Sequence, residues 1–213
     1  MGALQDNPLF AGLAVFFTLC FIIGLRSFHN ICPYLFSSVF RWKYAIELED
    51  SLQLSRSRNH IALILAIPVC MVAYSYSLYD PDIFKDLSPS LKLLATCAVI
   101  LTQIPIRAFL NWQFTPGGSR PKAFQAAGGL IYNYVILLFF LLFASGAALT
   151  ALTGDQALVR KILLWLTGIS YCLFVIRKGQ ILRSACNPFV TILYLCGLEL
   201  LPSAILVIPG MLL

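Results

Sequence analysis

Charged residues are scarce in this sequence of 213 amino acids, where they make up only 11% of the total. A soluble domain carries about 25% charged residues, so this chain has too few to cover a folded surface with solvated groups. Hydrophobic residues, in contrast, make up 60%. This balance excludes a disordered chain, a soluble enzyme and a disulfide-stapled secreted module, and it leaves an integral membrane protein.

The sequence also lacks the motifs of common catalytic and ligand-binding sites. It has no HExxH zinc motif, no GxSxG nucleophile turn and no GxxxxGK[ST] phosphate loop. Its seven cysteines include no CxxC pair. Most of them lie in apolar runs, so we interpret them as small hydrophobic residues and not as disulfides or metal ligands. We therefore expect no enzyme activity, no metal site and no cofactor.

Long apolar runs are abundant. A helix needs about 20 apolar residues to cross the ~30 Å core of a bilayer, and six candidates have roughly that length. They comprise residues 9–25, 60–79, 91–112, 124–149, 159–176 and 189–213. Each span must satisfy its own backbone hydrogen bonds in lipid, and no ten-residue strand alternation is present. We predict an all-α bundle of about six transmembrane helices that forms one membrane domain, residues 1–213.

The basic residues are sorted by side of the membrane. Eleven of the 15 Lys and Arg residues fall in or beside the first, third and fifth connections between the predicted spans, and the other four fall on the opposite side. Positively charged loops stay in the cytoplasm, so we predict that both termini are periplasmic. The first span lacks a basic flank and a cleavage site, so we expect it to be retained. The net charge of +6 then reflects topology and contact with the lipid bilayer, and we expect no nucleic acid partner.

The connection between the first two spans, residues 26–59, is the longest. Pro33 suits the first position of a helix, and apolar residues recur after it at helical spacing. We predict an amphipathic helix here, which either lies at the membrane interface or packs under the bundle. The acidic residues 47–50 follow it. A metal site is one interpretation of this acidic run, but we favour a solvated face.

Glu199 is the most conspicuous polar residue within a predicted span. It lies about ten residues, or roughly 15 Å, into the last span and therefore near the bilayer midplane. Pro202 weakens the helix three residues later, and Cys196 and Ser203 are spaced to share the face of Glu199. Glu199 is either a proton-carrying group or counter-ion, or a residue that fixes helix packing through a hydrogen bond.

The third predicted span carries a polar face. Gln103, Arg107 and Asn111 follow one another at four-residue spacing, and we expect their shared face to point into the bundle or a wet cavity. Arg107 is either a functional group or a residue that pairs with another helix and extends toward the headgroups. Asn133, in the fourth span, is a candidate hydrogen-bonding partner of this face.

Three further basic residues, Arg177, Lys178 and Arg183, lie at the predicted cytoplasmic boundary between spans five and six. At that depth they complement headgroup phosphates and the negative end of a helix. We therefore name them as candidate headgroup or anion contacts. The positive-inside rule alone also accounts for them.

Residues 171–202 contain a short Arg-Lys-Gly segment followed by the run LYLCGLELLP. This stretch resembles the signature of an uncharacterised family of small polytopic inner-membrane proteins in Bacteroidota. That family has an arginine-glycine turn and then a helix of the form LYLCxLExLP; here Lys178 separates the arginine from the glycine. The resemblance implies a Gram-negative inner membrane and marks Arg177, Glu199 and Pro202. It implies no activity.

Two functions fit these features. The first, which we favour, is a non-enzymatic accessory or scaffold subunit of a cell-envelope assembly, with the segment 26–59 as a contact surface for a protein partner. The second is a small carrier or lipid-handling protein for an anionic substrate. In the second, Glu199 supplies a protonatable group at the midplane, and Arg107 and Arg177 attract the substrate.

Overall fold

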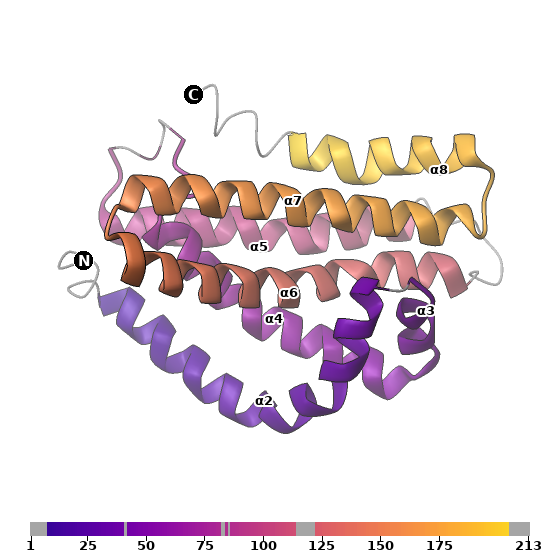
Figure 1. The fold of residues 1–213 in the computed structure, drawn as a ribbon, viewed down its shortest axis with the longest axis horizontal. Helices are drawn as coiled ribbons and strands as arrows, with labels where there is room; N and C mark the ends of the chain where they lie inside the picture. Colours follow the sequence, from indigo (N-terminus) through magenta and orange to yellow (C-terminus); the bar gives the residue numbers. More distant parts are fainter. Residues whose placement is uncertain (1–7, 41, 82–83, 85, 114–121, 205–213) are drawn as a thin grey trace.

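The computed structural model describes residues 8–40, 42–81, 84, 86–113 and 122–204. Helices dominate these residues and no strand occurs among them, which confirms the predicted all-α class for the described part of the chain (Figure 1). The elements in chain order are α2 (Pro8–Phe40), α3 (Trp42–Asp50), α4 (Leu52–Ser75), α5 (Pro89–Gln113), α6 (Lys122–Thr153), α7 (Gln156–Arg183), α8 (Pro188–Leu195) and the π-helical turn η2 (Cys196–Leu200).

The long helices run back and forth between the two ends of an elongated molecule (Figure 1). α6 packs against both α4 and α7, and α2 packs against α4. One apolar cluster joins α2, α4 and α6 around Leu65 and Ile136, and a second joins α3, α6 and α7 around Ala127 and Ile181. The buried apolar residues of α6 therefore hold both sides of the bundle together.

A tight turn connects α6 to α7. Gly154 has a φ of +64°, in the left-handed region that glycine enters without a Cβ clash. The side chain of Asp155 then accepts a hydrogen bond of 2.9 Å from the backbone N–H of Ala157 and caps the start of α7. These two residues make α6 and α7 antiparallel neighbours.

Five helices are long and apolar enough to cross a membrane: α4, α5, α6, α7 and the first part of α2, Pro8–Leu25. They overlap the first five predicted spans. The sixth predicted span, 189–213, is described only as far as Ala204, and the apolar helix Pro188–Ala204 is shorter than the other five. The rest of that predicted span lies outside the described residues.

The segment 26–59, expected to be a loop around one amphipathic helix, is organised differently. α2 continues from the first span to Phe40, so the prediction that Pro33 begins a new helix is wrong. A proline inside a helix removes one backbone hydrogen bond and favours a bend, and α2 is visibly bent (Figure 1). α3 follows with Ala45 and Leu48 buried, and it packs against α2 and α6. This packing favours the alternative in which the segment lies under the bundle.

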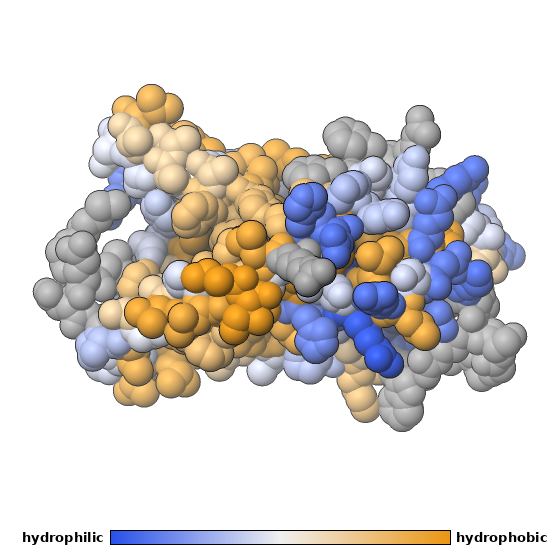
Figure 2. Space-filling view, turned by 90° about the horizontal axis from the view of Figure 1, so that it is seen from below, coloured by the Kyte–Doolittle hydropathy of each residue, from blue (hydrophilic) through white to orange (hydrophobic). Residues whose placement is uncertain are grey.

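Hydrophilic side chains gather at the end of the molecule where α3 lies (Figure 2). The start of α6 and the end of α7 meet α3 at the same end (Figure 1). Exposed charged residues here are Lys43, Glu47, Asp50, Arg56, Lys122 and Arg183. The described parts of the predicted basic connections therefore come together, and we call this end the polar end.

Candidate functional site

Glu199 lies at the centre of a buried cluster of three ionisable side chains. Its side chain is 1% exposed, and cations from two other helices contact it. Nζ of Lys178 on α7 donates a hydrogen bond to Oε1 of Glu199. Nη1 of Arg107 on α5 lies 3.0 Å from Oε2. The side chains of Lys178 and Arg107 are only 4% and 10% exposed. We call these three residues the buried ion cluster.

A local change in helix geometry accompanies the position of Glu199. The turn η2, Cys196–Leu200, is π-helical, and such a turn inserts an extra residue that rotates the flanking residues relative to each other. Pro202 lies two residues after this turn and has no N–H to close an ordinary turn. Cys196 is exposed although Glu199 is buried. The expectation that Cys196, Glu199 and Ser203 share one face is therefore wrong for Cys196.

Two hydroxyl groups extend the cluster toward α7. The hydroxyl of Tyr171 donates to the backbone carbonyl of Glu199 at 2.9 Å and lies 2.6 Å from Oγ of Ser203. Nη2 of Arg107 donates to the same Oγ at 2.6 Å. The guanidinium carbon of Arg107 also lies 5.7 Å from the centroid of the Tyr171 ring, within cation–π range. The contacts tie α5, α7 and the C-terminal helix to one another.

The buried ion cluster combines two cations with one carboxylate. Removing ions from water costs several kcal/mol per ion, and mutual attraction repays this only when the geometry is good. Nε of Arg107 has no hydrogen-bond partner among the described residues. The geometry therefore makes Glu199 a counter-ion that balances part of the charge of Arg107 and Lys178.

Only part of the predicted intramembrane site comes together. Arg107 reaches Glu199, and Lys178 joins them although it was expected only at the lipid boundary. Asn111, one turn beyond Arg107, accepts a hydrogen bond of 2.5 Å from the Tyr194 hydroxyl on α8. Gln103 is not part of the cluster, and its buried side-chain oxygen has no hydrogen-bond partner among the described residues.

The remaining predicted residues lie apart from the cluster. Asn133 donates from Nδ2 to Oγ of Ser38 on α2 at 3.3 Å, so its expected partnership with the third span is wrong. Arg177 donates from Nη1 to Gln180 at 2.8 Å, and Arg183 is exposed. The Arg-Lys-Gly segment is not a turn, because α7 continues through it to Arg183.

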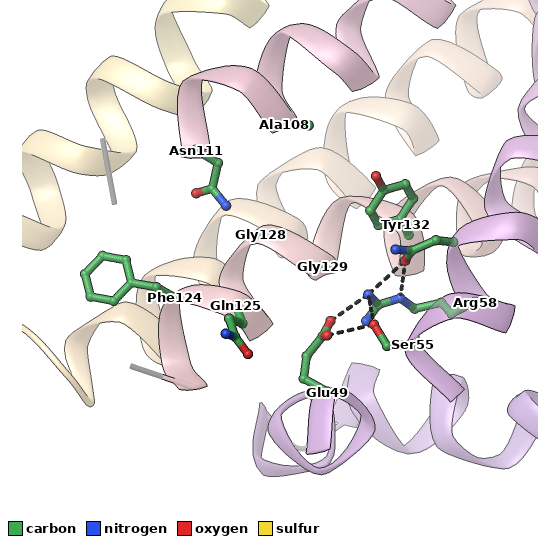
Figure 3. A pocket seen from close by; sticks show the side chains of 11 residues that line it. Glu49, Ser55, Arg58, Ala108, Asn111, Phe124, Gln125, Gly128, Gly129 and Tyr132 are labelled. Carbon is green, nitrogen blue, oxygen red and sulfur yellow. Dashed lines mark hydrogen bonds and ion pairs between the residues drawn. The ribbon is translucent and has the colours of Figure 1, made fainter. Parts of the chain in front are cut away.

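A second polar cluster, which sequence reasoning missed, borders a cavity at the polar end (Figure 3). Arg58 of α4 is 1% exposed, and its Nη2 lies 2.6 Å from Oε1 of Glu49 on α3. Ser55 donates to Oε2 of Glu49 at 2.8 Å, and Arg58 donates to Asn59 at 2.9 and 3.1 Å. The cavity beside them has a volume of about 230 Å³. The interpretation of the acidic run 47–50 as a solvated face is therefore wrong for Glu49.

Two adjacent glycines of α6 let the second cluster approach that helix. A Cβ on Gly129 would clash most closely with Oε1 of Glu49 and would also lie 2.5 Å from Nη2 of Arg58, and a Cβ on Gly128 would clash with Asn111. Only glycine, which has no side chain, leaves room for these polar groups so close to the backbone of α6. The glycine pair inside an apolar helix is a sequence signal that could have indicated this site, but it does not identify the charged residue that packs against it.

α5 lies between the two polar clusters. Arg107 belongs to the buried ion cluster, whereas Ala108 and Asn111 line the cavity beside Arg58. The hydrogen bond between Asn111 and Tyr194 then returns to the C-terminal helix. The two clusters are therefore neighbouring parts of one polar layer.

No family model, curated protein or solved structure matches this chain. The class of protein therefore rests on its fold and its buried charges. Five long apolar helices, three of which are joined by buried ion pairs to α3 or to the C-terminal helix, are the make-up of a multi-pass integral membrane protein.

Proposed function

We propose that this chain is a non-enzymatic protein of a bacterial inner membrane that serves as an accessory or scaffold subunit in cell-envelope assembly. One observation carries the proposal. Glu199 is the residue best placed to bind and release a proton, yet it is enclosed between Arg107 and Lys178 on two other helices. Buried ions that cross-link three helices favour a body of fixed shape, which suits a protein that holds a partner.

The proposal includes six passes with both termini in the periplasm. The helix Pro188–Ala204 packs on α7, and the sequence continues with the apolar run ILVIPGMLL. Together these stretches have the length of a span. The polar end, which gathers the basic residues, then faces the cytoplasm. Membership of the Bacteroidota family that the C-terminal run resembles is part of the same proposal.

The surface proposed for the protein partner is the outer side of α3 and the start of α4. Ala45 and Leu48 anchor α3 in the bundle, while Lys43, Glu47 and Arg56 are exposed. This mixture of charges at the membrane boundary offers a partner complementary ion pairs and hydrogen bonds. Contact of α3 with lipid headgroups at the interface is the alternative use of the same surface.

Affinity purification of the tagged protein from native membranes tests the scaffold proposal. We expect one partner at a stoichiometric ratio, quantified by mass spectrometry. Glu47→Lys on α3 should lower its recovery severalfold. Lys161→Glu, an exposed site on α7 at the opposite end, is the matched control and should leave recovery unchanged. Absence of any stoichiometric partner from the wild-type preparation would overturn the proposal.

A small carrier for an anionic substrate, or a lipid-handling protein, is the second candidate. The cavity of about 230 Å³ beside Arg58 favours it, because it offers polar groups to a small molecule inside a membrane protein. Lys178, and not Arg177, is the second cation beside Glu199. Glu199→Gln separates the candidates: a carrier loses transport and keeps its thermal midpoint, whereas in a scaffold the midpoint falls.

A further inference from the structure

A cleft of about 210 Å³ lies between α6 and α7, and Ser38 of α2 also lines it. Its apolar lining includes Leu130, Leu137 and Leu141 of α6 and Leu173 of α7. From residue 130 to residue 141 the cleft follows α6 for about 16 Å, at 1.5 Å per residue. An apolar slot that runs along two helices offers a lipid acyl chain a surface on which to bury its methylene groups.

Arg177 lines the end of this cleft that lies toward the polar end. It is one helical turn beyond Leu173 and about 9 Å along α7 from the last residue, Arg183. An arginine at this depth extends toward the level of the headgroup phosphates. The neighbouring Lys178 instead contacts Glu199. The two adjacent basic residues therefore serve different sites.

Asn133 also lines the cleft, and the residue is 2% exposed. The hydroxyl of Ser38 donates its proton to the backbone carbonyl of Leu35 at 2.7 Å. Ser38 can therefore only accept from Asn133, which fixes Nδ2 as the donor between them. Oδ1 of Asn133 is then left without a hydrogen-bond partner among the described residues. A buried acceptor in this state gains from a donor brought by a bound molecule.

We propose that the cleft between α6 and α7 binds one anionic phospholipid, with the phosphate on Arg177 and an acyl chain in the apolar slot. The inference rests on the membrane location proposed above, but not on the scaffold or the carrier role. A guanidinium binds phosphate through two parallel charge-assisted hydrogen bonds. A hydroxyl of a glycerol headgroup can donate the hydrogen bond that Oδ1 of Asn133 does not receive from the described residues. The apolar walls favour a lipid over a soluble anion.

Native mass spectrometry of the full-length protein, released from nanodiscs of equal phosphatidylglycerol and phosphatidylcholine, tests this site. We expect the wild type to retain one phosphatidylglycerol, in about fivefold preference, the effect of one basic residue at an anionic surface. Arg177→Gln should abolish the preference. Ser170→Phe, which fills the slot, should reduce retention of both lipids. Arg183→Gln, at an exposed position of the same end, and Leu164→Phe, on an exposed part of α7, are the matched controls.

An equal preference for phosphatidylglycerol in the wild type and in Arg177→Gln would overturn the proposal. An equal loss of that preference in Arg183→Gln would also overturn it, because the overall positive charge of this end would then explain the binding. Thermal midpoints of all variants show whether each has folded. If Arg177→Gln does not fold, Arg177→Met replaces it and should also abolish the preference, because it keeps an apolar stem but removes the charge; an unchanged preference counts against the site. Because purified protein is measured, failure to find a protein partner does not affect this result.

Discussion

Replacing Glu199 by glutamine is the most direct test of the buried ion cluster. The side chain keeps its size but loses its charge, so Arg107 and Lys178 remain buried beside each other without their carboxylate. Removing one partner of a buried ion pair costs about 3–5 kcal/mol, because it leaves an uncompensated charge. We expect Glu199→Gln to lower the free energy of unfolding by that amount.

Lys178→Met tests the same reasoning from the other side, because we expect it to change the stability little. It removes a buried cation but leaves the Arg107–Glu199 pair, in which one charge balances the other. The methionine also fills the volume of the lysine stem. We therefore expect a loss of about 1 kcal/mol or less, or even a gain in stability.

Denaturant unfolding of the purified protein in mild detergent measures these free energies. A double-mutant cycle of Glu199→Gln and Lys178→Met should give a coupling energy of about 1–3 kcal/mol. Lys122→Gln is the control, because its ion pair with Asp50 joins side chains that are 72% and 47% exposed; we expect a change of about 0–1 kcal/mol. The reasoning is refuted if Glu199→Gln costs no more than this control, or if Lys178→Met costs as much as Glu199→Gln.

Two further substitutions test the second polar cluster and its link to the C-terminal helix. Gly129→Ala should cost about 1–3 kcal/mol in thermal unfolding, because its Cβ clashes with the carboxylate of Glu49 and the buried guanidinium of Arg58 and displaces both. Gly168→Ala, whose Cβ meets nothing within 4 Å, should be neutral or stabilise by up to about 1 kcal/mol. Tyr194→Phe removes the hydroxyl that bonds Asn111 and should cost about 1 kcal/mol in the same assay.

The apolar runs sufficed to predict the long helices, because length and composition alone decide whether a helix can cross lipid. They did not predict where α2 ends. Pro33 is statistically favoured at a helix start, but here burial of Ile31 and Leu35 on either side of it keeps the chain helical through the proline. That burial depends on α4 and α6, which approach only in the folded molecule.

The sequence pointed to Glu199 and Arg107 because an ionisable residue in an apolar run is rare and therefore conspicuous. Lys178 was missed as their partner because the fifth span was expected to end at residue 176, whereas α7 continues to Arg183. The Glu49–Arg58 pair was hidden for a different reason. Each residue lay in an ordinary charged stretch, and only the packing of α3 beside α4 and the glycines of α6 buries them together.

The excess positive charge of the buried ion cluster also bears on topology. Arg107 and Lys178 lie in the halves of α5 and α7 nearest the polar end, so the cluster reinforces the basic bias of that end instead of opposing it. Glu199→Gln leaves unchanged the Lys and Arg residues on which this bias depends. Inversion of the protein in the membrane is therefore not an explanation for any loss of function in that variant. Such a loss would report on the cluster itself, either through its stability or through the chemistry of its carboxylate.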